Sequence, residues 1–473
     1  MINDIKKQME QILNITKNYT HFDSRVTIGQ RWSYITNPEN IIKHKFYPLI
    51  HYVKTTAKYD KAANCIKKKE RDLYYAAHLD RAVYTYYAYK TNEFYNKYIQ
   101  KHNLDNVSIA YRKNKGSSIF FAKQAIDRIR RESCYIIVGD FKSFFDTLDH
   151  TYLKEQLCKI FHEDRLSKDY YAVFKNVTKY HFCDLDDLIR LSIEKNLLNK
   201  SNENIRIQEK YNKKYISQQD FNKLSRICTP QEFRTLVKGN KLIKAHEEIK
   251  GIPQGIAIAS VWANVYMIKF DEIVNKNIIN LDGMFMRYSD DFIMVIPKKN
   301  IKEDNLKLKY EWVCSEVAKI KLNLEPNKTR VYAYNHEQET IKNITSKILG
   351  TSLINCNDRL DYLGFTFDGK KVRLRDKAIF KYYYKLYRKI NTWSRQVIDG
   401  KHRRKTNIYE IYSLKGLKND TKIHFSKGSF IKYVNRCKQI FGEELFEEAI
   451  LKRHMKKIKR RIKNDLASLR AIE

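Results

Sequence analysis

Three aspartates stand where carboxylates have no evident packing role. Asp140 comes just after a short apolar run at 134–138, and Asp290 and Asp291 lie together inside an otherwise apolar segment at 284–296. Carboxylates held at strand ends are the ligands that Mg²⁺ prefers. Two such ions about 3.5 to 4 Å apart stabilise both the attacking and the leaving oxygen of an in-line displacement at phosphorus. The three acids therefore predict a metal-dependent phosphoryl-transfer site, provided that their segments lie side by side.

The segments that carry the acids have the pattern of strands. The run at 134–138, CYIIV, is β-branched and aromatic and is followed by a glycine, which predicts a buried strand. Apolar runs at 284–288 and 292–296 flank Ser-Asp-Asp, and Pro297 stops the second run, which predicts a tight hairpin with the acids at its tip. Each acid also has an ordinary explanation, because Asp favours turns and helix N-caps. The site exists only if all three acids share one sheet.

Five short motifs accompany these acids in the chain. They are DFKSFFD at 140–146, GIPQG at 251–255, YSDD at 288–291, LEPNKT at 324–329 and YLGF at 362–365. In sequence and order they resemble the palm and primer-grip motifs of reverse transcriptases of the group II intron and bacterial lineage. Residues 71–81 and AYRKNKG at 110–116 resemble the fingers motifs of the same family. The likeness therefore covers about 71–367, and five motifs in family order make chance a poor explanation.

The resemblance implies catalytic roles for several residues. The side chains of Asp140, Asp290 and Asp291 would hold two Mg²⁺ ions, with Mn²⁺ as an alternative. The backbone carbonyl of Phe141 would be an additional ligand. Lys328 would protonate or stabilise the leaving pyrophosphate.

The resemblance also assigns residues to the incoming nucleotide. Arg112 would clamp the triphosphate with its planar fork of donors. Gln254 would contact the nucleotide, and Gly255 would let the backbone approach it closely. Phe145 matches the steric gate, where an aromatic ring collides with a ribose 2′-hydroxyl and selects dNTPs. Phe144 is adjacent, and only one of the two rings can face the pocket.

The end of the chain resembles a primer grip followed by a thumb. Tyr362, Leu363 and Gly364 match the primer-grip motif. The remainder is basic and is expected to be helical, with clusters KHRRK at 401–405 and KRHMKKIKRRIK at 452–463.

Departures from the family pattern narrow the resemblance. They are Ala259-Ser260 where group II intron enzymes usually carry Ser-Pro, Ser289 where Ala is common, and a separation of about 110 residues between Asp140 and Gly251. No cysteine-bearing endonuclease motif is seen after the thumb. The chain looks closest to the bacterial abortive-infection and defence-associated reverse transcriptases.

Charge and composition point to nucleic acid as the partner. The 473 residues contain 91 Lys and Arg against 54 Asp and Glu, a formal charge of +37. Lysines of an AT-rich genome would decorate any surface, but this excess is larger than solubility requires. The eight cysteines have no CxxC spacing, so neither a zinc site nor a disulfide framework is expected. With no apolar signal core and no membrane-spanning run, a cytoplasmic location is expected.

Helices are expected around the strands. Apolar residues recur at three-to-four spacing over 71–99, and similar patterns predict helices at 120–132 and, buried, at 256–274. Only six prolines and fourteen glycines interrupt the chain, so a mostly helical body is expected.

The predicted architecture is an α+β, predominantly helical right-hand polymerase with fingers, a palm built on an antiparallel sheet, and a helical thumb. The expected parts are a basic helical N-terminal extension at 1–55, fingers at 56–132, a palm at 133–350 with a charged helical insertion at about 151–249, and primer grip, thumb and basic C-terminal region at 351–473.

The sequence thus predicts an RNA-directed DNA polymerase that uses dNTPs. It would copy a structured non-coding RNA, or add nucleotides with little templating, in bacterial anti-phage defence. RNA template, DNA product and dNTPs are the expected partners, no membrane is expected, and the oligomeric state is open. The alternatives are a group II intron-type reverse transcriptase and maturase, and a catalytically idle RNA-binding protein with a polymerase fold. RNA-templated RNA synthesis is disfavoured if Phe145 is the gate.

Overall fold

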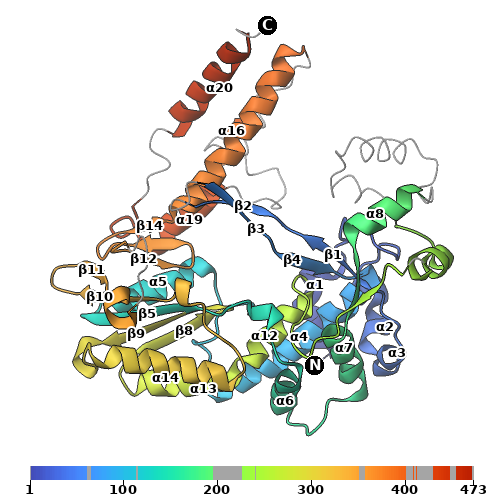
Figure 1. The fold of residues 1–473 in the computed structure, drawn as a ribbon, viewed down its shortest axis with the longest axis horizontal. Helices are drawn as coiled ribbons and strands as arrows, with labels where there is room; N and C mark the ends of the chain where they lie inside the picture. Colours follow the sequence, from blue (N-terminus) through green and yellow to red (C-terminus); the bar gives the residue numbers. More distant parts are fainter. Residues whose placement is uncertain are drawn as a thin grey trace.

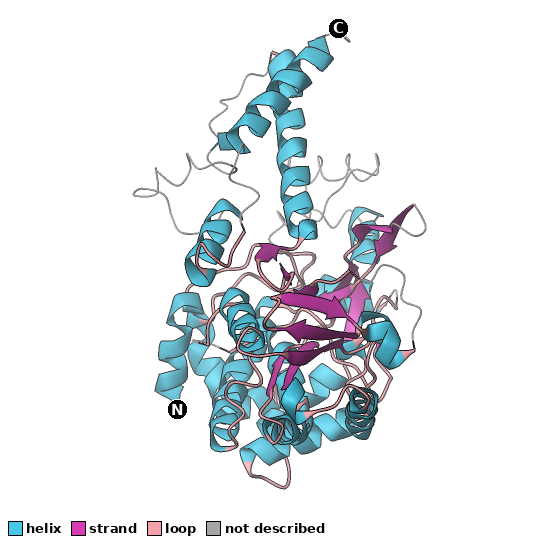
Figure 2. Ribbon diagram, turned by 90° about the vertical axis from the view of Figure 1, so that its left-hand side faces the viewer, coloured by secondary structure: helices cyan, strands magenta, loops and turns pink. Residues whose placement is uncertain are grey.

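A five-stranded antiparallel sheet has helices against both of its faces (Figures 1 and 2). The computed structural model describes residues 2–60, 65–112, 115–194, 226–239, 241–350, 357–400, 408–409, 412, 430–447 and 454–470. The strand order is β11-β10-β5-β9-β8. The bounds are β5 (Cys134–Asp140), β8 (Met284–Tyr288), β9 (Asp291–Pro297), β10 (Arg330–Asn335) and β11 (Thr340–Asn343).

Each face of this sheet packs on its own hydrophobic core, as the alternation of side chains along a strand requires. Ile137 of β5 and Met294 of β9 join a large core with α4 (His78–Lys101), α12 (Ala257–Tyr266) and α13 (Ile268–Ile279). Ile136 and Ile293 point the other way, into a core with α5 (Ser118–Ile129) and the base of the thumb. Both faces of the strand that carries Asp140 are therefore fixed by packing.

The fingers are a second sheet surrounded by helices. Its order is β4-β1-β6-β7, with a separate β2–β3 hairpin (Figure 1). The strands are β1 (Leu49–Val53), β2 (Thr56–Asp60), β3 (Cys65–Lys69), β4 (Asp72–Tyr75), β6 (His181–Asp184) and β7 (Lys244–Ala245). The helices are α1 (Ile2–Leu13), α2 (Trp32–Thr36), α3 (Pro38–Ile42), α6 (His150–Phe161), α7 (Lys168–Thr178) and α8 (Leu185–Glu194).

The thumb is a small sheet followed by long helices that project from the body (Figure 1). It contains β12 (Leu360–Tyr362), β13 (Phe365–Phe367), β14 (Val372–Leu374), α16 (Asp376–Ile398), α19 (Phe430–Phe441) and α20 (His454–Arg470). Helices α16 and α20 pack through Leu386 and Ile390 against Ile458 and Ile462. The remaining elements are α11 (Pro230–Glu232), a π-helix (Phe233–Lys238), α14 (Asn305–Lys319) and α15 (Thr345–Leu349).

The predicted fold class is confirmed, and several element predictions need correction. The pattern at 71–99 is not one helix, because β4 pairs with β1 before α4 begins at His78. The N-terminal extension includes strand β1, and the insertion at 151–249 includes β6 and β7, because these strands complete the fingers sheet. The segment at 256–274 is two helices that meet at Met267.

Part of the sequence predictions lies outside the described residues. The basic cluster at 401–405 and residues 195–225 of the predicted charged insertion belong to that part of the chain. The second basic cluster is largely in α20. Among the described residues, every helix is too short or too polar to span a bilayer.

Candidate active site

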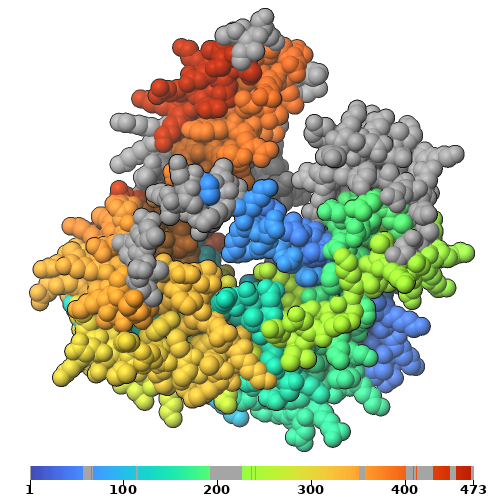
Figure 3. All heavy atoms as spheres, viewed as in Figure 1, coloured from blue at the N-terminus to red at the C-terminus, as the bar shows by residue number. Residues whose placement is uncertain are grey.

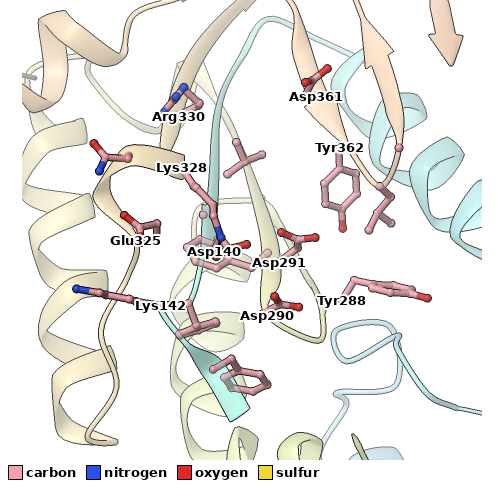
Figure 4. Close-up of a pocket in the computed structure, with 18 of the residues that line it drawn as sticks. Asp140, Lys142, Tyr288, Asp290, Asp291, Glu325, Lys328, Arg330, Asp361 and Tyr362 are labelled. Carbon is pink, nitrogen blue, oxygen red and sulfur yellow. Dashed lines mark hydrogen bonds and ion pairs between the residues drawn. The ribbon is translucent and has the colours of Figure 1, made fainter. Parts of the chain in front are cut away.

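The structure brings the three acids together. Asp140 is the last residue of β5 and pairs directly with Asp291, the first residue of β9. Asp290 lies in the adjoining β8–β9 turn, and its backbone oxygen accepts a hydrogen bond of 3.1 Å from the amide of Phe141. Figure 4 shows the three carboxylates facing the same space. The predicted hairpin and strand are therefore neighbours in one sheet, with the acids at a shared edge.

A glycine keeps the two strands in this register. Gly139 pairs with Phe292, and a Cβ atom at this position would lie 2.3 Å from the Phe292 ring. Any side chain there would displace the ring or separate the strands. Because Gly139 precedes Asp140 and Phe292 follows Asp291, this close contact fixes the alignment of the two acids.

The Asp140 end of the site is joined to a neighbouring loop. The carbonyl oxygen of Asp140 accepts a hydrogen bond of 2.8 Å from the amide of Glu325, and the amide of Lys142 donates to the carbonyl of Asn323 at 2.9 Å. Farther along this loop, the Lys328 ammonium forms an ion pair with the Asp140 carboxylate. Lys328 thus lies inside the site, as the resemblance implied.

The carboxylates of Asp140, Asp290 and Asp291 lie close enough for their charges to affect one another. Burial and the charges of Asp290 and Asp140 raise the pKa of Asp291 to about 7, although its side chain is open to the cavity. Burial and the charge of Asp140 also raise the pKa of Asp290. Carboxylates that disfavour each other's ionisation are a site that a divalent cation would neutralise.

The donor set fits magnesium ions. Among the described residues, no three His, Cys, Asp or Glu side chains converge as a preformed metal cage. Mg²⁺ does not require one, because it usually binds through one or two carboxylates together with water and substrate phosphates. The opposed pair of Asp140 and Asp291, with Asp290 beside them, is such a set.

The acids line a cavity of about 1400 Å³ between fingers, palm and thumb (Figure 3). Its wall carries many polar and charged groups. Basic residues reach it from several elements: Lys69 and Arg71 from the end of the hairpin β2–β3, Lys142 and Lys328 from the palm, Arg330 from β10, and Arg375 and Lys377 from the start of α16. An anionic polymer that entered this cavity would meet cations on most sides.

Phe145 and Gln254 both line this cavity. The adjacent ring of Phe144 is 4% exposed and belongs to the core, whereas Phe145 is only partly buried. Both residues border the cavity, and Phe145 has the more exposed ring of the two. Its use as a gate remains a prediction.

Position 255 requires glycine for a structural reason that the sequence does not show. Its φ is +122°, and a Cβ atom would lie 2.4 Å from the carbonyl oxygen of Tyr74 in β4. The amide of Tyr74 also donates to the carbonyl of Gln254 at 2.8 Å. Gly255 does not line the cavity. The residue needs to be glycine because the 251–255 loop packs on the fingers, and this contact positions Gln254.

The role predicted for Arg112 is contradicted by its contacts. Its guanidinium donates to the side chain of Asn96, to the backbone oxygens of Asp105 and Ser108, and to the Asp105 carboxylate. The side chain is 1% exposed and is absent from the cavity wall. Four of its five N–H donors are thus used within the protein, and Arg112 stabilises its own loop away from the cavity.

Lys69 and Arg71 are the cations that the sequence analysis did not assign. Both line the cavity, and burial together with Arg71 lowers the pKa of Lys69. The cationic run ending at Arg71 is visible in the sequence. Its position over the acids depends on the pairing of β2 with β3 and of β1 with β4, which links distant segments.

The predicted primer-grip residues form one turn at the cavity wall. Tyr362, Leu363 and Gly364 all line the cavity, with φ of +45° at Leu363 and +90° at Gly364. Figure 4 shows the Tyr362 ring directed toward the acids. The ring is buried, and its hydroxyl has no hydrogen-bond partner among the described residues.

Among solved structures, the chain is distantly similar to telomerases of yeasts. The apo telomerase of Candida tropicalis, truncated from its C-terminal domain, is 12% identical over 74% of this chain and 61% of that chain, with a TM-score of 0.37. The telomerase of Candida albicans in complex with a fragment of telomeric RNA is 13% identical over 93% of this chain and 66% of that chain, also with a TM-score of 0.37. This chain thus spans less than two thirds of either telomerase chain.

Among curated protein sequences, none matches the chain significantly. Residues 194–367 match the family described as reverse transcriptase (RNA-dependent DNA polymerase), which is less than half of the chain. The match includes Asp290 and Asp291 and begins after Asp140, whose place beside them comes from the sheet. Residues 194–367 therefore have the sequence pattern of a reverse transcriptase domain, a family of RNA-directed DNA polymerases.

Proposed function

We propose that this protein extends a nucleic acid 3′ end with dNTPs on an RNA template. The observation that carries the proposal is the pairing of Asp140 with Asp291 across β5 and β9, with Asp290 in the adjoining turn. These acids lie in a cavity lined by cations from the fingers, palm and thumb. Such a cavity suits a phosphodiester chain and a triphosphate at the same time.

The side chains at the site have separate tasks in this proposal. Asp140, Asp290 and Asp291 would hold two Mg²⁺ ions, or Mn²⁺ as an alternative, with the carbonyl of Phe141 as a further ligand. When bound, the ions supply charge stabilisation for the attacking 3′ oxygen and the leaving pyrophosphate.

Basic side chains would bind the triphosphate. Lys69 and Arg71 replace Arg112 in this task, because they line the cavity and, within the described part of the chain, their charged groups have no internal hydrogen bonds like those of Arg112. Lys328, already paired with Asp140, would stabilise the pyrophosphate as it leaves.

DNA is the proposed product because of the ring at Phe145. The ring lies in the cavity wall, in the short 3₁₀ turn Phe144–Asp146. Ser143 precedes this turn, and its φ of +47° changes the direction of the chain after strand β5. There the Phe145 ring would exclude a ribose 2′-hydroxyl. Gln254 in the opposite loop would contact the same nucleotide. The turn of Tyr362, Leu363 and Gly364 would hold the primer end.

For the biological role, we propose synthesis on a structured non-coding RNA in bacterial anti-phage defence. The support is the motif pattern, with GIPQG, Ala259-Ser260 and AYRKNKG as in the defence-associated enzymes. The alternative within the same enzyme class is an intron-type reverse transcriptase and maturase. An intron RNA flanking the gene would favour that alternative.

One extension experiment tests the reaction and the choice of nucleotide. The purified protein is given Mg²⁺, a DNA primer annealed to an RNA or a DNA template of the same sequence, and either dNTPs or NTPs. We expect extension on RNA with dNTPs. The variant Phe145→Ala should retain extension with dNTPs and gain extension with NTPs. Absence of extension by wild type on any template, with the template still bound, would favour the idle RNA-binding protein.

A further inference from the structure

Arg287 is a fully buried arginine directly behind the catalytic turn. It lies in β8, next to Tyr288, and its side chain is 0% exposed. Its Nε and Nη2 atoms donate to the two carboxylate oxygens of Asp271 at 2.8 and 2.7 Å, and Asp271 itself is 1% exposed. This bidentate pair joins the hairpin to α13.

The other donors of Arg287 reach the turn and its surroundings. Nη1 donates to the carbonyl oxygen of Ser289 at 2.9 Å and to Oδ1 of Asn264 at 3.2 Å. Nη2 also donates to Oγ of Ser108 at 3.2 Å. Together these contacts use all five N–H donors of the guanidinium.

Ser289 is the residue that determines where the catalytic acids point. Its φ of +59° is left-handed, a conformation that costs a non-glycine residue energy and persists only where neighbouring groups impose it. Ser289 immediately precedes Asp290 and Asp291. The guanidinium of Arg287 donates to the carbonyl oxygen of this residue and so stabilises the turn from which both carboxylates project.

The same arginine joins the turn to a loop of the fingers. Its amide donates to the carbonyl of Val107 at 2.8 Å, and its carbonyl accepts from the amide of Ile109 at 3.1 Å. Asn264, which accepts from Arg287, donates through Nδ2 to the carbonyl of Ala110 at 2.8 Å. The next residue, Tyr111, lines the cavity. One buried network thus contacts the catalytic turn and an adjacent wall of the site.

Stability alone does not explain a buried ion pair at this position. Desolvation of the two charges offsets much of their attraction, and apolar residues of similar volume often replace such pairs without loss of stability. The neighbours of Arg287 in the hairpin, including Met286 and Phe292, are apolar core residues. What an apolar side chain would not supply is the hydrogen bond to the Ser289 carbonyl.

We propose that Arg287, held by Asp271, is a positioning residue that sets the orientation of Asp290 and Asp291 opposite Asp140. The inference rests on the proposed function for its catalytic consequence. Its structural content concerns these carboxylates as ligands of a divalent ion, and metal binding can be measured separately from nucleotide incorporation.

The test compares two variants of Arg287 with the wild type. Arg287→Met combined with Asp271→Leu removes the charges together and keeps an apolar volume. Arg287→Lys keeps the charge and the pairing with Asp271, but its ammonium cannot span all the acceptors. Three quantities are measured: the melting temperature, kcat and KM for dNTP, and Mn²⁺ binding by electron paramagnetic resonance in the absence of nucleic acid.

We expect both variants to lower kcat by about 10- to 100-fold, since small misplacements of catalytic groups have effects of this size. We expect weaker Mn²⁺ binding as well, with little change in the KM for dNTP. Asp169→Asn is the matched control, because Asp169 is a buried carboxylate that accepts from Tyr87 at 2.7 Å outside the cavity wall. It should lower the melting temperature and leave the kcat of the folded protein and Mn²⁺ binding unchanged.

Wild-type kcat and wild-type Mn²⁺ affinity in a folded Arg287→Lys or double variant would overturn the inference. If the double variant does not fold, the result for Arg287→Lys decides. If the wild type incorporates no nucleotide, the proposed function fails. The inference then still stands if the Arg287 variants weaken a Mn²⁺ site that Asp290→Asn plus Asp291→Asn abolishes, and it falls if they do not.

Discussion

The acids of the β8–β9 turn and the acid at the end of β5 are held by different parts of the molecule. Behind Asp290 and Asp291 lies the buried network of Arg287, in which every guanidinium donor has an acceptor. Asp140 is held by backbone hydrogen bonds to the 323–325 loop and by Lys328, whose side chain is 49% exposed. One end depends on buried side chains and the other on the main chain and an open ion pair.

This difference separates the consequences of mutation at the two ends. Buried charges are costly when one partner is lost, so changes behind the turn should affect stability and activity together. Changes at the other end remove either Lys328, which water already solvates, or Asp140, whose carboxylate faces the charge of Asp291, so they should affect activity with little effect on stability. Mutations around the same cavity should therefore fall into two groups, those that lower stability and activity together and those that lower activity alone.

The largest expected effect is the loss of Asp140. Asp140→Asn removes a charge opposite Asp291, and we expect dNTP incorporation to fall on the order of 10³-fold or more, because the site would hold less well the metal ions that stabilise the developing negative charge. The melting temperature should be unchanged or higher, since a repulsive carboxylate is gone. Pre-steady-state incorporation and thermal unfolding of the same preparation measure both. A large loss of stability would show that the Asp140 side chain contributes to folding, contrary to this expectation.

Breaking the buried pair should have the largest effect on stability. Asp271→Ala leaves Arg287 charged and unpaired, which is expected to cost about 3 to 5 kcal/mol of unfolding free energy. The matched control is Asp361→Ala, because Asp361 pairs with Arg375 at 3.3 Å with both side chains about half exposed. The control should lose about 1 kcal/mol or less. Chemical denaturation of both variants decides, and equal losses would remove the contrast between buried and open pairs.

Lys328 tests the Asp140 end of the site without removing a metal ligand. Lys328→Gln removes the ammonium beside Asp140, and we expect kcat to fall about 10²-fold because charge on the leaving pyrophosphate is less stabilised. The stability change should stay within about 0.5 kcal/mol, as for other exposed positions. Steady-state kinetics at saturating dNTP and denaturation curves measure the two quantities. An unchanged kcat would limit Lys328 to a surface ion pair.

The smallest expected effect is a pH dependence of stability in the metal-free protein. The Asp291 carboxyl has a pKa raised to about 7 by burial, Asp290 and Asp140. In the unfolded chain it ionises near pH 4. Between about pH 4 and pH 7 the folded protein therefore binds a proton that the unfolded chain has released, so stability falls as the pH rises through this window. Melting temperatures in EDTA from pH 5 to pH 8 measure this slope.

Asp291→Asn is the control for this slope, because the variant has no carboxyl to titrate. Its melting temperature should depend less on pH than that of the wild type. Added Mg²⁺ should raise the wild-type value at pH 8 and not that of the variant. Parallel pH curves for the two proteins would show that the crowded carboxylates store no measurable repulsion.

Local patterns in the sequence were sufficient to predict the palm. Short apolar runs ended by Gly139, by the Ser-Asp-Asp turn and by Pro297 predict a strand and a hairpin, because turn chemistry and side-chain alternation are properties of neighbouring residues. The motifs added the order of the acids. Together they predict that the strand and the hairpin lie side by side in one sheet, and the structure shows Asp140 paired with Asp291.

Contacts between distant segments were not predictable in the same way. In the sequence, nothing distinguishes Arg112 from other cations, and only the structure shows its four internal acceptors. The need for glycine at position 255 comes from a close contact with the backbone of Tyr74, which is distant in the sequence. The apolar pattern at 71–99 predicts a helix over the residues of strand β4, because the strand forms only by pairing with β1, about twenty residues away. The buried pair of Arg287 and Asp271 left no local signal, since a charged residue in a strand usually faces water.

The central claim is that Asp140, Asp290 and Asp291 form one polymerase site. Its most direct test is incorporation of labelled dNTPs on a primed RNA template by wild type and by Asp290→Asn plus Asp291→Asn, with RNA binding measured in parallel. We expect extension by wild type, loss of extension in the double variant, and equal RNA binding by both. Equal extension by the two proteins would contradict it.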